Sequence, residues 1–243
     1  MSLFQSAASY INEFERGFSS RKRGASRGQI HQLESLTGKR LPADYADFAE
    51  VMGADMGGVD VGPFDLSIDR VIEFYRSGQW LAQTPFFRIG EGTRFPVSHP
   101  HLKVLDLPGE ENEVVLIPDY TAATFQQSLR GLTPLAGSLA ELICMPIFDR
   151  HELNNEEREA VTMQGAMSDT ALERAEAVLV SLGFTKHWFS SATGRAFWRT
   201  DGAAKAVQTY LGPLKVSVSS DTAGRGEEMA DHLEKALGVR RVG

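Results

Sequence analysis

The stretch from Ser26 to Arg76 constrains the fold more than any other part of the chain, because signals for helix starts, helix ends and a chain break follow one another closely there. Ser26 can begin a helix, since its hydroxyl can accept a hydrogen bond from a backbone N–H of the first turn. Apolar residues then recur at helical spacing until Gly38, which suits the left-handed conformation that ends many helices. Pro42 suits the first turn of a second helix, where no N–H donor is needed. The sequence therefore predicts two consecutive helices.

A double glycine ends the second predicted helix and separates it from a third element. The apolar stripe of the second helix consists of Tyr45, Phe48, Ala49 and Met52, and the break follows at Gly57 and Gly58. After Pro63, apolar residues at positions 64–75 begin in a short extended segment and continue at helical spacing. We expect a short strand that runs directly into a third helix.

Twelve residues of this stretch match the sequence pattern of a known family. They are Ile30, Leu33, Glu34 and Leu36 in the first predicted helix, Gly38, Leu41, Pro42, Asp44, Tyr45 and Phe48 leading into and along the second, and Gly57 and Gly58 in the break. The pattern resembles the SUKH superfamily, which includes Smi/Knr-type fungal cell-wall regulators, the SecY-interacting protein Syd and many bacterial toxin-immunity proteins. Many members carry an asparagine before the double glycine, where this chain has Met56.

The resemblance covers about residues 25–147 and leaves the last third of the chain unassigned. It implies an antiparallel sheet held between helices. It also implies a function in binding a partner protein, with no chemistry of its own. The superfamily hosts several functions, so the fold by itself does not choose among them.

Outside this stretch, hydrophobic periodicity predicts an N-terminal helix and several strands. Apolar residues at positions 4, 7, 11, 14 and 18 share one face of a helix over residues 2–18. We expect that face to pack on the protein's own core, with a partner groove or a self-association seam as the alternative. Strands are expected near residues 86–89, 95–107 and 114–117, followed by helices over 122–130 and 132–143.

The composition shifts after residue 146, where a charged segment poor in large apolar residues follows. We predict an α+β protein with an N-terminal helix and SUKH-like domain over residues 1–150, a linker over 151–167, and a smaller α-β-β-β-β-α domain over 168–243. In the smaller domain, Trp188 and Trp198 are expected on paired strands. Core packing is their expected role, and an interface is the alternative.

The net charge of −7 and the single cysteine narrow the classes of function. An acidic protein lacks the basic surface of a general nucleic-acid binder, whereas opposite charge would favour a basic protein partner. Cys144 excludes an internal disulfide and fits a reducing compartment. No run approaches the roughly 18–20 apolar residues of a membrane helix, and the N-terminus lacks a signal pattern. We therefore expect a cytoplasmic protein that binds neither membranes nor nucleic acid.

The sequence contains no glycine-rich phosphate loop, nucleophile elbow, H-E-x-x-H motif or paired C-x-x-C. His99 and His101 would share one face of an extended segment and could reach one metal ion, but a zinc site needs further ligands. We expect a loop with two solvated histidines instead. Residues 149–152 hold residue types that suit acid–base chemistry, and an exposed linker is the expected interpretation. We predict no catalytic, cofactor-binding or metal-binding residues.

Acidic residues in two places form the predicted partner-binding surface. One group, in an expected hairpin loop, consists of Glu110, Glu111 and Glu113. The other group flanks the double glycine and consists of Asp55, Asp60, Asp65 and Asp69. Both groups would attract lysines and arginines of a basic partner, and solvated turns are the alternative for the glutamates.

These observations favour a non-enzymatic protein-binding module, most concretely a bacterial immunity protein that neutralises a toxin by occlusion. A regulatory adaptor or scaffold of the Smi/Knr type is the first alternative. An enzyme or ligand-binding protein with a site between the two domains is the second. The sequence leaves the identity of the partner and the oligomeric state open.

Overall fold

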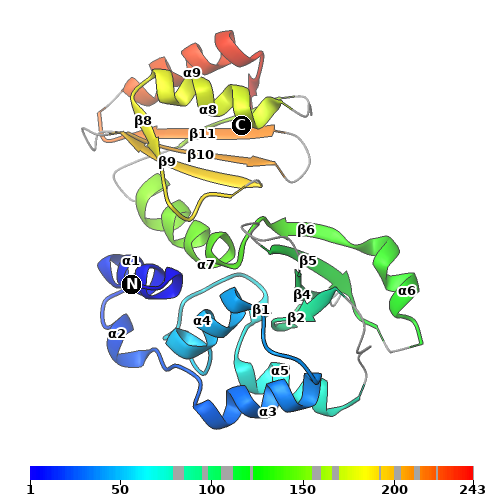
Figure 1. Ribbon diagram of the computed structural model, residues 1–243. Coiled ribbons are helices and arrows are strands. Elements are labelled where there is room, and N and C mark those ends of the chain that lie inside the picture. Colours follow the sequence, from blue (N-terminus) through cyan, green and yellow to red (C-terminus); the bar gives the residue numbers. More distant parts are fainter. Residues whose placement is uncertain are drawn as a thin grey trace. The chain divides into compact units, whose positions relative to one another are not determined.

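The computed structural model divides the chain into two compact units, residues 1–144 and 145–243. It describes residues 1–78, 85–94, 98–104, 112–120, 123–154, 160–165, 170–191, 193–199, 204–210, 214–222 and 224–242. Both units combine helices with antiparallel sheets, so the predicted α+β class is confirmed (Figure 1). Among the described residues, no helix has the length and apolar character needed to cross a membrane.

The first unit contains several helical segments, and the helix predicted over residues 2–18 is divided into the first two of them. The segments are α1 (Leu3–Phe14), α2 (Phe18–Arg21), α3 (Arg27–Thr37), α4 (Ala43–Met52), α5 (Ile68–Arg76), α6 (Phe125–Ser128), the 3-10 turn η1 (Leu129–Gly131) and α7 (Leu139–Ile147), which contains the boundary between the units. Ser26 caps α3 in a capping box with Gln29, and Gly38 ends it at φ 67°. Pro42 precedes α4 as its N-cap residue.

The strands of the first unit form two antiparallel sheets. The smaller sheet pairs β1 (Phe64–Asp65) with β3 (Glu91–Gly92). The larger sheet has the order β2-β4-β5-β6, formed by β2 (Phe86–Arg88), β4 (Ser98–Lys103), β5 (Glu113–Pro118) and β6 (Thr133–Ala136). The expected strands over 86–89 and 114–117 are therefore confirmed. Within the expected strand region over 95–107, residues 98–103 form β4, and residues 95–97 and 105–107 lie outside the described residues.

The helix predicted over residues 132–143 is wrong in its first half. Residues 133–136 form β6, and α7 begins only at Leu139. Pro134 is compatible with this strand because β6 lies at the edge of the sheet and pairs with β5 alone. Within the predicted helix, Pro134 instead marks an edge strand.

The apolar face of α1 packs within the first unit, as expected. Phe4 and Ile11 are fully buried, and the ring of Phe4 meets the ring of Phe48 edge-on at 5.6 Å. The backbone N–H of Phe4 also donates to the Asp47 carboxylate at 3.0 Å. The apolar face of α1 is therefore buried against the first unit's own core. It is not left open for self-association, the alternative named above.

The double glycine lets the chain pass close to α2. Gly57 and Gly58 have φ values of 65° and 84°, which residues with a side chain rarely adopt. A Cβ atom on Gly57 would lie 2.9 Å from Cδ2 of Phe18. The side chain of Arg21 holds the loop from the same helix, since its Nε donates to the Gly57 carbonyl at 2.8 Å.

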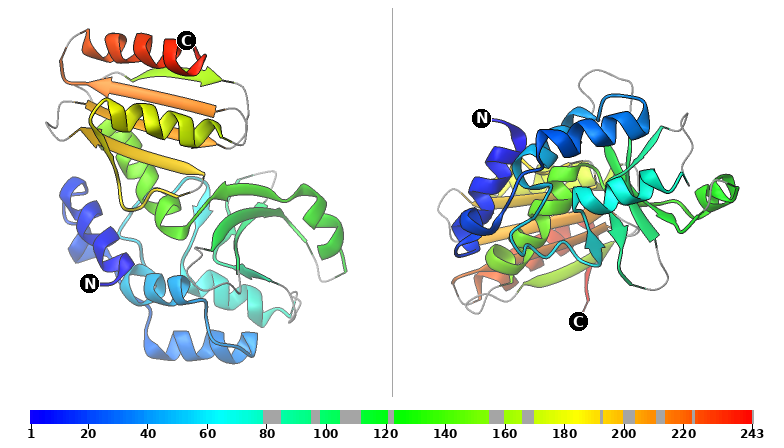
Figure 2. Two further views of the ribbon diagram at one scale, coloured as in Figure 1. Left: turned by 45° about the horizontal axis from the view of Figure 1, so that its top comes forward. Right: turned by 90° about the horizontal axis from the view of Figure 1, so that it is seen from below.

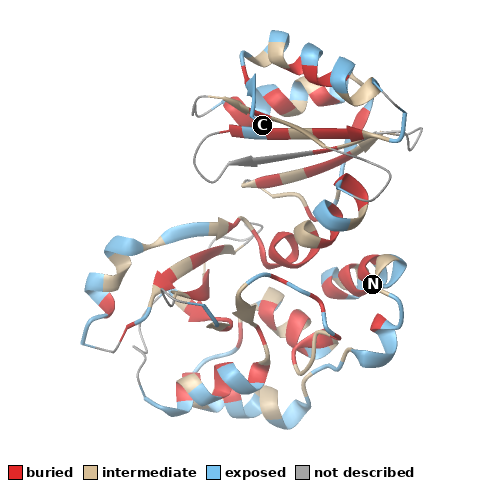
Figure 3. Ribbon diagram, turned by 180° about the vertical axis from the view of Figure 1, so that it is seen from behind, coloured by how far each residue is buried: buried red, intermediate tan, exposed pale blue. Residues whose placement is uncertain are grey.

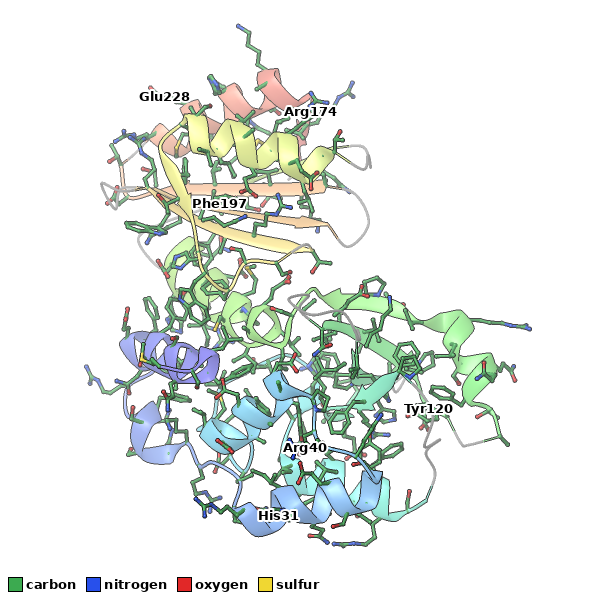
Figure 4. The ribbon with its side chains drawn as sticks, viewed as in Figure 1. His31, Arg40, Tyr120, Arg174, Phe197 and Glu228 are labelled. Carbon is green, nitrogen blue, oxygen red and sulfur yellow. The ribbon has the colours of Figure 1, made fainter. Side chains whose placement is uncertain are left out.

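The second unit is an antiparallel sheet with two helices on one face (Figures 1 and 2). Its strands, in the order β12-β7-β11-β10-β9-β8, are β12 (Arg240–Arg241), β7 (Val161–Gly165), β11 (Leu214–Ser220), β10 (Ala204–Tyr210), β9 (Gly194–Arg199) and β8 (Phe184–Lys186). The helices are α8 (Ala171–Ser181) and α9 (Arg225–Leu237). Figure 3 shows buried residues along both the sheet and the helices. Phe197, which Figure 4 labels, Val216 and Leu233 belong to the buried core of this unit.

The predicted order of this unit is confirmed from α8 to α9, and β7 and β12 extend the sheet at one edge. The boundary differs from the predicted one. The segment expected as a linker over 151–167 contains β7 and the end of the π-helix η2 (Phe148–Leu153). Trp198 lies on β9, whereas Trp188 lies beyond the end of β8 and is 43% exposed.

The double glycine generates a testable contrast. Gly57→Ala should destabilise the protein more than Gly62→Ala, although both residues have positive φ. Gly62→Ala carries only the left-handed backbone cost of about 1–2 kcal/mol, because a Cβ atom there would meet no atom within 4 Å. Gly57→Ala adds the clash with Phe18, about 1–3 kcal/mol more. Urea denaturation of both variants measures the difference, and equal losses would contradict the proposed close passage.

Candidate functional site

A hollow of about 300 Å³ lies beside the double-glycine loop, and we call it the double-glycine cleft. Apolar side chains that line it include Met56, Val59, Val61 and Phe64. The carboxylates of Asp55 and Asp65 lie at the same hollow, with side chains that are 41% and 40% exposed. Two of the seven residues predicted to bind a partner thus come together in one concave surface.

Three of the predicted aspartates also shape the backbone around the cleft. The carboxylate of Asp55 accepts from the Gly57 N–H at 2.8 Å, that of Asp60 from the Gly62 N–H at 2.9 Å, and that of Asp65 from the Ser67 N–H at 2.9 Å. Each bond joins a side chain to the backbone two residues later, which is the Asx-turn arrangement. These residues were predicted from their charge alone, and their part in the turns was missed.

Arginine side chains offset part of the negative charge at the cleft. Arg23 pairs with Asp55 at 3.2 Å, and both side chains are well exposed. Arg70 contacts three carboxylates, those of Glu73 at 3.2 Å, Asp65 at 3.6 Å and Glu91 at 3.7 Å. The hydrogen bond to Glu73 and the charges of Glu91, Glu73 and Asp65 raise the pKa of Arg70. Three carboxylates share this one guanidinium, so the group keeps an excess of negative charge.

Of the other predicted acidic residues that the structure describes, Asp60, Asp69 and Glu113 are not among those that line the cleft. Asp69 accepts a hydrogen bond from Nε2 of Gln29 at 2.8 Å and so ties α5 to α3. Glu113 pairs with Lys103 across β4 and β5 at 3.3 Å. Glu110 and Glu111 lie outside the described residues.

A buried polar network connects β2, β3 and β4 on the same unit. The guanidinium of Arg88, which is 7% exposed, donates through Nε to the Gly90 carbonyl and through Nη2 to Nδ1 of His99, both at 2.9 Å. It also lies over the ring of Phe74, 4.1 Å from the centroid. Nδ1 of His99 accepts a second bond from the Gly92 N–H at 3.2 Å. Because Nδ1 accepts from two donors, the ring proton is assigned to Nε2.

The two histidines of this network are held neutral. Nε2 of His99 donates to the exposed Asp119 carboxylate at 3.2 Å. His101 donates from Nδ1 to the His99 carbonyl and accepts at Nε2 from the Tyr120 hydroxyl, both at 2.8 Å. Burial lowers the pKa of His99 and lowers that of His101 to about 3. The hydroxyl of Tyr75 accepts a hydrogen bond from the backbone N–H of Arg88 at 2.9 Å. Burial raises the pKa of this hydroxyl.

The expectation of a loop with two solvated histidines is therefore wrong. His99 and His101 lie on β4 and are 4% and 1% exposed. Their spacing of two was the available signal, because it places both rings on the same face of a strand. Among the described residues, no group of three or more histidine, cysteine or acidic side chains is placed to hold a metal ion.

A second buried ionic group lies in the second unit. Glu152, at the end of η2, pairs with Lys205 of β10 at 2.5 Å. Nε2 of His187 lies 3.9 Å from the other oxygen of Glu152, and its ring stacks on Phe189 at 4.9 Å. Burial, which outweighs the nearby Glu152 carboxylate, lowers the pKa of His187. The expected exposed linker over 149–152 is wrong at Glu152, since the residue that pairs with it lies far away in the sequence.

Comparison with protein-family models, with curated proteins and with solved structures finds no match for this chain. The function is therefore inferred from the chain's own geometry. Of the groups described above, the double-glycine cleft alone combines a hollow with exposed charge. The buried networks of both units instead use their polar atoms internally.

The neutral histidines make stability depend on pH. In the unfolded chain a histidine takes up a proton near pH 6.5, whereas His99 and His101 take it up at lower pH when folded. The unfolded state then binds more protons below pH 6.5. Stability is therefore fully present above that pH and is lost as the pH falls, by up to about 1.4 kcal/mol per pH unit for each histidine.

Urea denaturation between pH 7.5 and 5.5 measures this loss. The variant His31→Gln is the matched control, because His31 is exposed on α3 and should leave the slope unchanged (Figure 4). His101→Gln should reduce the slope. A free energy of unfolding that stays constant over this pH range would contradict the assignment of neutral, buried histidines.

The ion pair of the second unit generates a separate prediction. Lys205→Met should cost about 3 kcal/mol of unfolding free energy, because the buried carboxylate of Glu152 loses its counter-charge. The double variant Glu152→Gln/Lys205→Met should recover most of that loss, since no buried charge remains. Chemical denaturation of the wild type, of Lys205→Met, of Glu152→Gln and of the double variant tests this. Additive losses from the two substitutions would show that the pair is not coupled.

Proposed function

We propose that the first unit is a protein-binding module of the SUKH type, and that the double-glycine cleft is the centre of its partner surface. The observation that carries the proposal is the joining of apolar side chains and two partly exposed carboxylates in one hollow. Protein interfaces have this composition, with an apolar centre and a polar rim. A side chain of the partner that is apolar along its length and basic at its end fits both parts of the cleft.

The charge distribution favours a basic partner. The chain has a net charge of −7, and the carboxylates around Arg70 outnumber its guanidinium. Complementary charge steers association and orients the partner, and its effect weakens as salt is added. Because Arg23 and Arg70 are themselves well exposed, a lysine or arginine of the partner can compete with them for Asp55 and Asp65.

The buried histidines and the buried cysteine of the first unit are used in its packing, which favours a binding function over a catalytic one. His99 and His101 use both ring nitrogens in hydrogen bonds. The thiol of Cys144 is buried, and burial raises its pKa, so little nucleophilic thiolate forms. These groups stabilise the fold that presents the cleft.

In its most concrete form, the proposal is a bacterial immunity protein that covers the active surface of a basic toxin domain. Occlusion and charge pairing are then the whole mechanism, and no residue acts as a catalyst. A regulatory adaptor would use the same cleft for a different basic partner. The SUKH resemblance over residues 25–147 is compatible with both.

The direct test begins with the chromosomal neighbourhood: a large secreted-toxin gene that precedes this one supplies the toxin domain, and its absence would count against the immunity form of the proposal. The purified toxin domain is titrated with the full-length chain by calorimetry, and the two are co-expressed to measure growth. We expect tight binding and restored growth. If the chain neither binds the toxin domain nor protects the cells, the immunity form of the proposal fails.

A pair of isosteric substitutions tests the surface. Asp55→Asn/Asp65→Asn removes two charges, while each asparagine keeps an oxygen that can accept from the N–H two residues later. We expect the affinity for the toxin domain to fall about tenfold, because two interfacial charge pairs contribute about 1–2 kcal/mol together. The dependence of the affinity on salt should also become flatter.

The matched control is Asp221→Asn/Glu228→Gln in the second unit, which changes the net charge equally at exposed positions (Figure 4). It should leave affinity and salt dependence unchanged. If both double variants weaken binding equally, the effect comes from net charge and the cleft is not the binding surface.

A further inference from the structure

The short strand β3 connects the buried network to the double-glycine cleft. On one side, the Gly92 N–H donates to Nδ1 of His99. On the other side, Gly92 pairs with Phe64 and Glu91 pairs with Asp65, and both of these β1 residues line the cleft. One backbone segment therefore touches the imidazole ring and holds a wall of the cleft.

The packing around β3 leaves no space to absorb a displacement. A Cβ atom on Gly92 would lie 2.0 Å from the Ser98 carbonyl oxygen, so the backbones of β3 and β4 are in direct contact. A Cβ atom on Gly90 would lie 2.6 Å from the Asp65 carbonyl oxygen. The Thr93 N–H also donates to the Pro63 carbonyl at 2.8 Å, next to β1. These contacts form a continuous backbone connection from His99 to Phe64 and Asp65.

We propose that protonation of Nδ1 of His99 releases β3 and opens the β1–β3 pairing, so that the double-glycine cleft is formed at neutral pH and loosened in acid. The coupling between His99 and β1 is a property of the free chain. Its consequence for a partner, release in acid, rests on the proposed function of the cleft.

The chemistry of the ring nitrogen explains the direction. Neutral His99 accepts at Nδ1 from two donors, the Arg88 guanidinium and the Gly92 N–H. A protonated ring carries an N–H at that position, so it can accept neither bond. Its positive charge would also face the guanidinium of Arg88 at a contact that is now 2.9 Å. Both donors must then separate from the ring, and Gly92 carries β3 with it.

The charged and titratable groups around His99 set the pH range. Arg88 on β2 opposes protonation, whereas Asp119 after β5 and Glu91 on β3 favour it. Burial is the largest influence, and the pKa of His99 lies below its usual value of 6.5. His101 on β4, whose pKa is about 3, stays neutral in the range where His99 responds. Tyr75 on α5 and Tyr120 after β5 have raised pKa values and stay neutral as well.

Amide hydrogen exchange on the free, full-length chain tests the coupling without any partner. Protection of peptides that cover residues 63–66 and 91–93 is measured at pH 7.0, 6.0 and 5.0 and corrected for intrinsic exchange rates. We expect protection in the wild type to fall with pH, by up to about tenfold per pH unit below the folded pKa. The α3 region is the internal reference and should not change in the same way.

His99→Asn is the decisive variant, because its side-chain oxygen can occupy the position of Nδ1 and accept both bonds without titrating. Its peptides should stay protected at pH 5.0, whereas the control His31→Asn should lose protection as the wild type does. Protection that is constant with pH in the wild type would overturn the proposal. An equal loss in His99→Asn would overturn it as well.

Asp119→Asn keeps the test decisive if His99→Asn does not fold. The Asp119 side chain is 70% exposed, and its charge favours the protonated ring. Its neutralisation should move the loss of protection to lower pH, and an unmoved transition would overturn the proposal. A failure of the toxin domain to bind at pH 7.0 would instead reject the proposed function alone.

Discussion

The contact between Arg88 and His99 supports the strands that border the double-glycine cleft. It joins β2 to β4 inside the protein, and the same ring nitrogen of His99 holds β3. Burying a guanidinium is costly unless it is hydrogen-bonded, and here the Gly90 carbonyl, the imidazole and the Phe74 ring surround it. The network therefore depends on a neutral histidine, which makes the position of β3 sensitive to protons.

The aspartates at the cleft make their turn bonds and their ion pairs with different oxygen atoms. One oxygen of Asp55 shapes the turn through the Gly57 N–H, while the other faces the guanidinium of Arg23. Asp65 is arranged in the same way with Ser67 and Arg70. The turn bonds are local and fix where the carboxylates point. The ion pairs are exposed and weak, so they leave the charge available to another basic group.

The second unit presents a different use of buried charge. The π-helix η2 places Glu152 against Lys205 on the central part of the sheet, beside His187 and its aromatic neighbours. A π-helical segment is uncommon because its hydrogen bonding is less favourable than that of an α-helix. The ion pair between Glu152 and Lys205 attaches η2 to β10. Residues of η2 that were expected in an exposed linker therefore belong to the packed second unit.

The sequence by itself determined the elements whose causes are local. Ser26, Gly38 and Pro42 set the ends of α3 and α4, and the α8-to-α9 order followed from periodicity and turn residues. Of the seven acidic residues predicted from the sequence, Asp55 and Asp65 line the cleft. Only the tertiary structure decided that Pro134 lies on an edge strand, that His99 and His101 are buried, and that Glu152 meets Lys205. The physical reason is distance along the chain: caps and turns involve neighbours within a few residues, whereas burial and ion pairing depend on groups that the fold brings together from far apart.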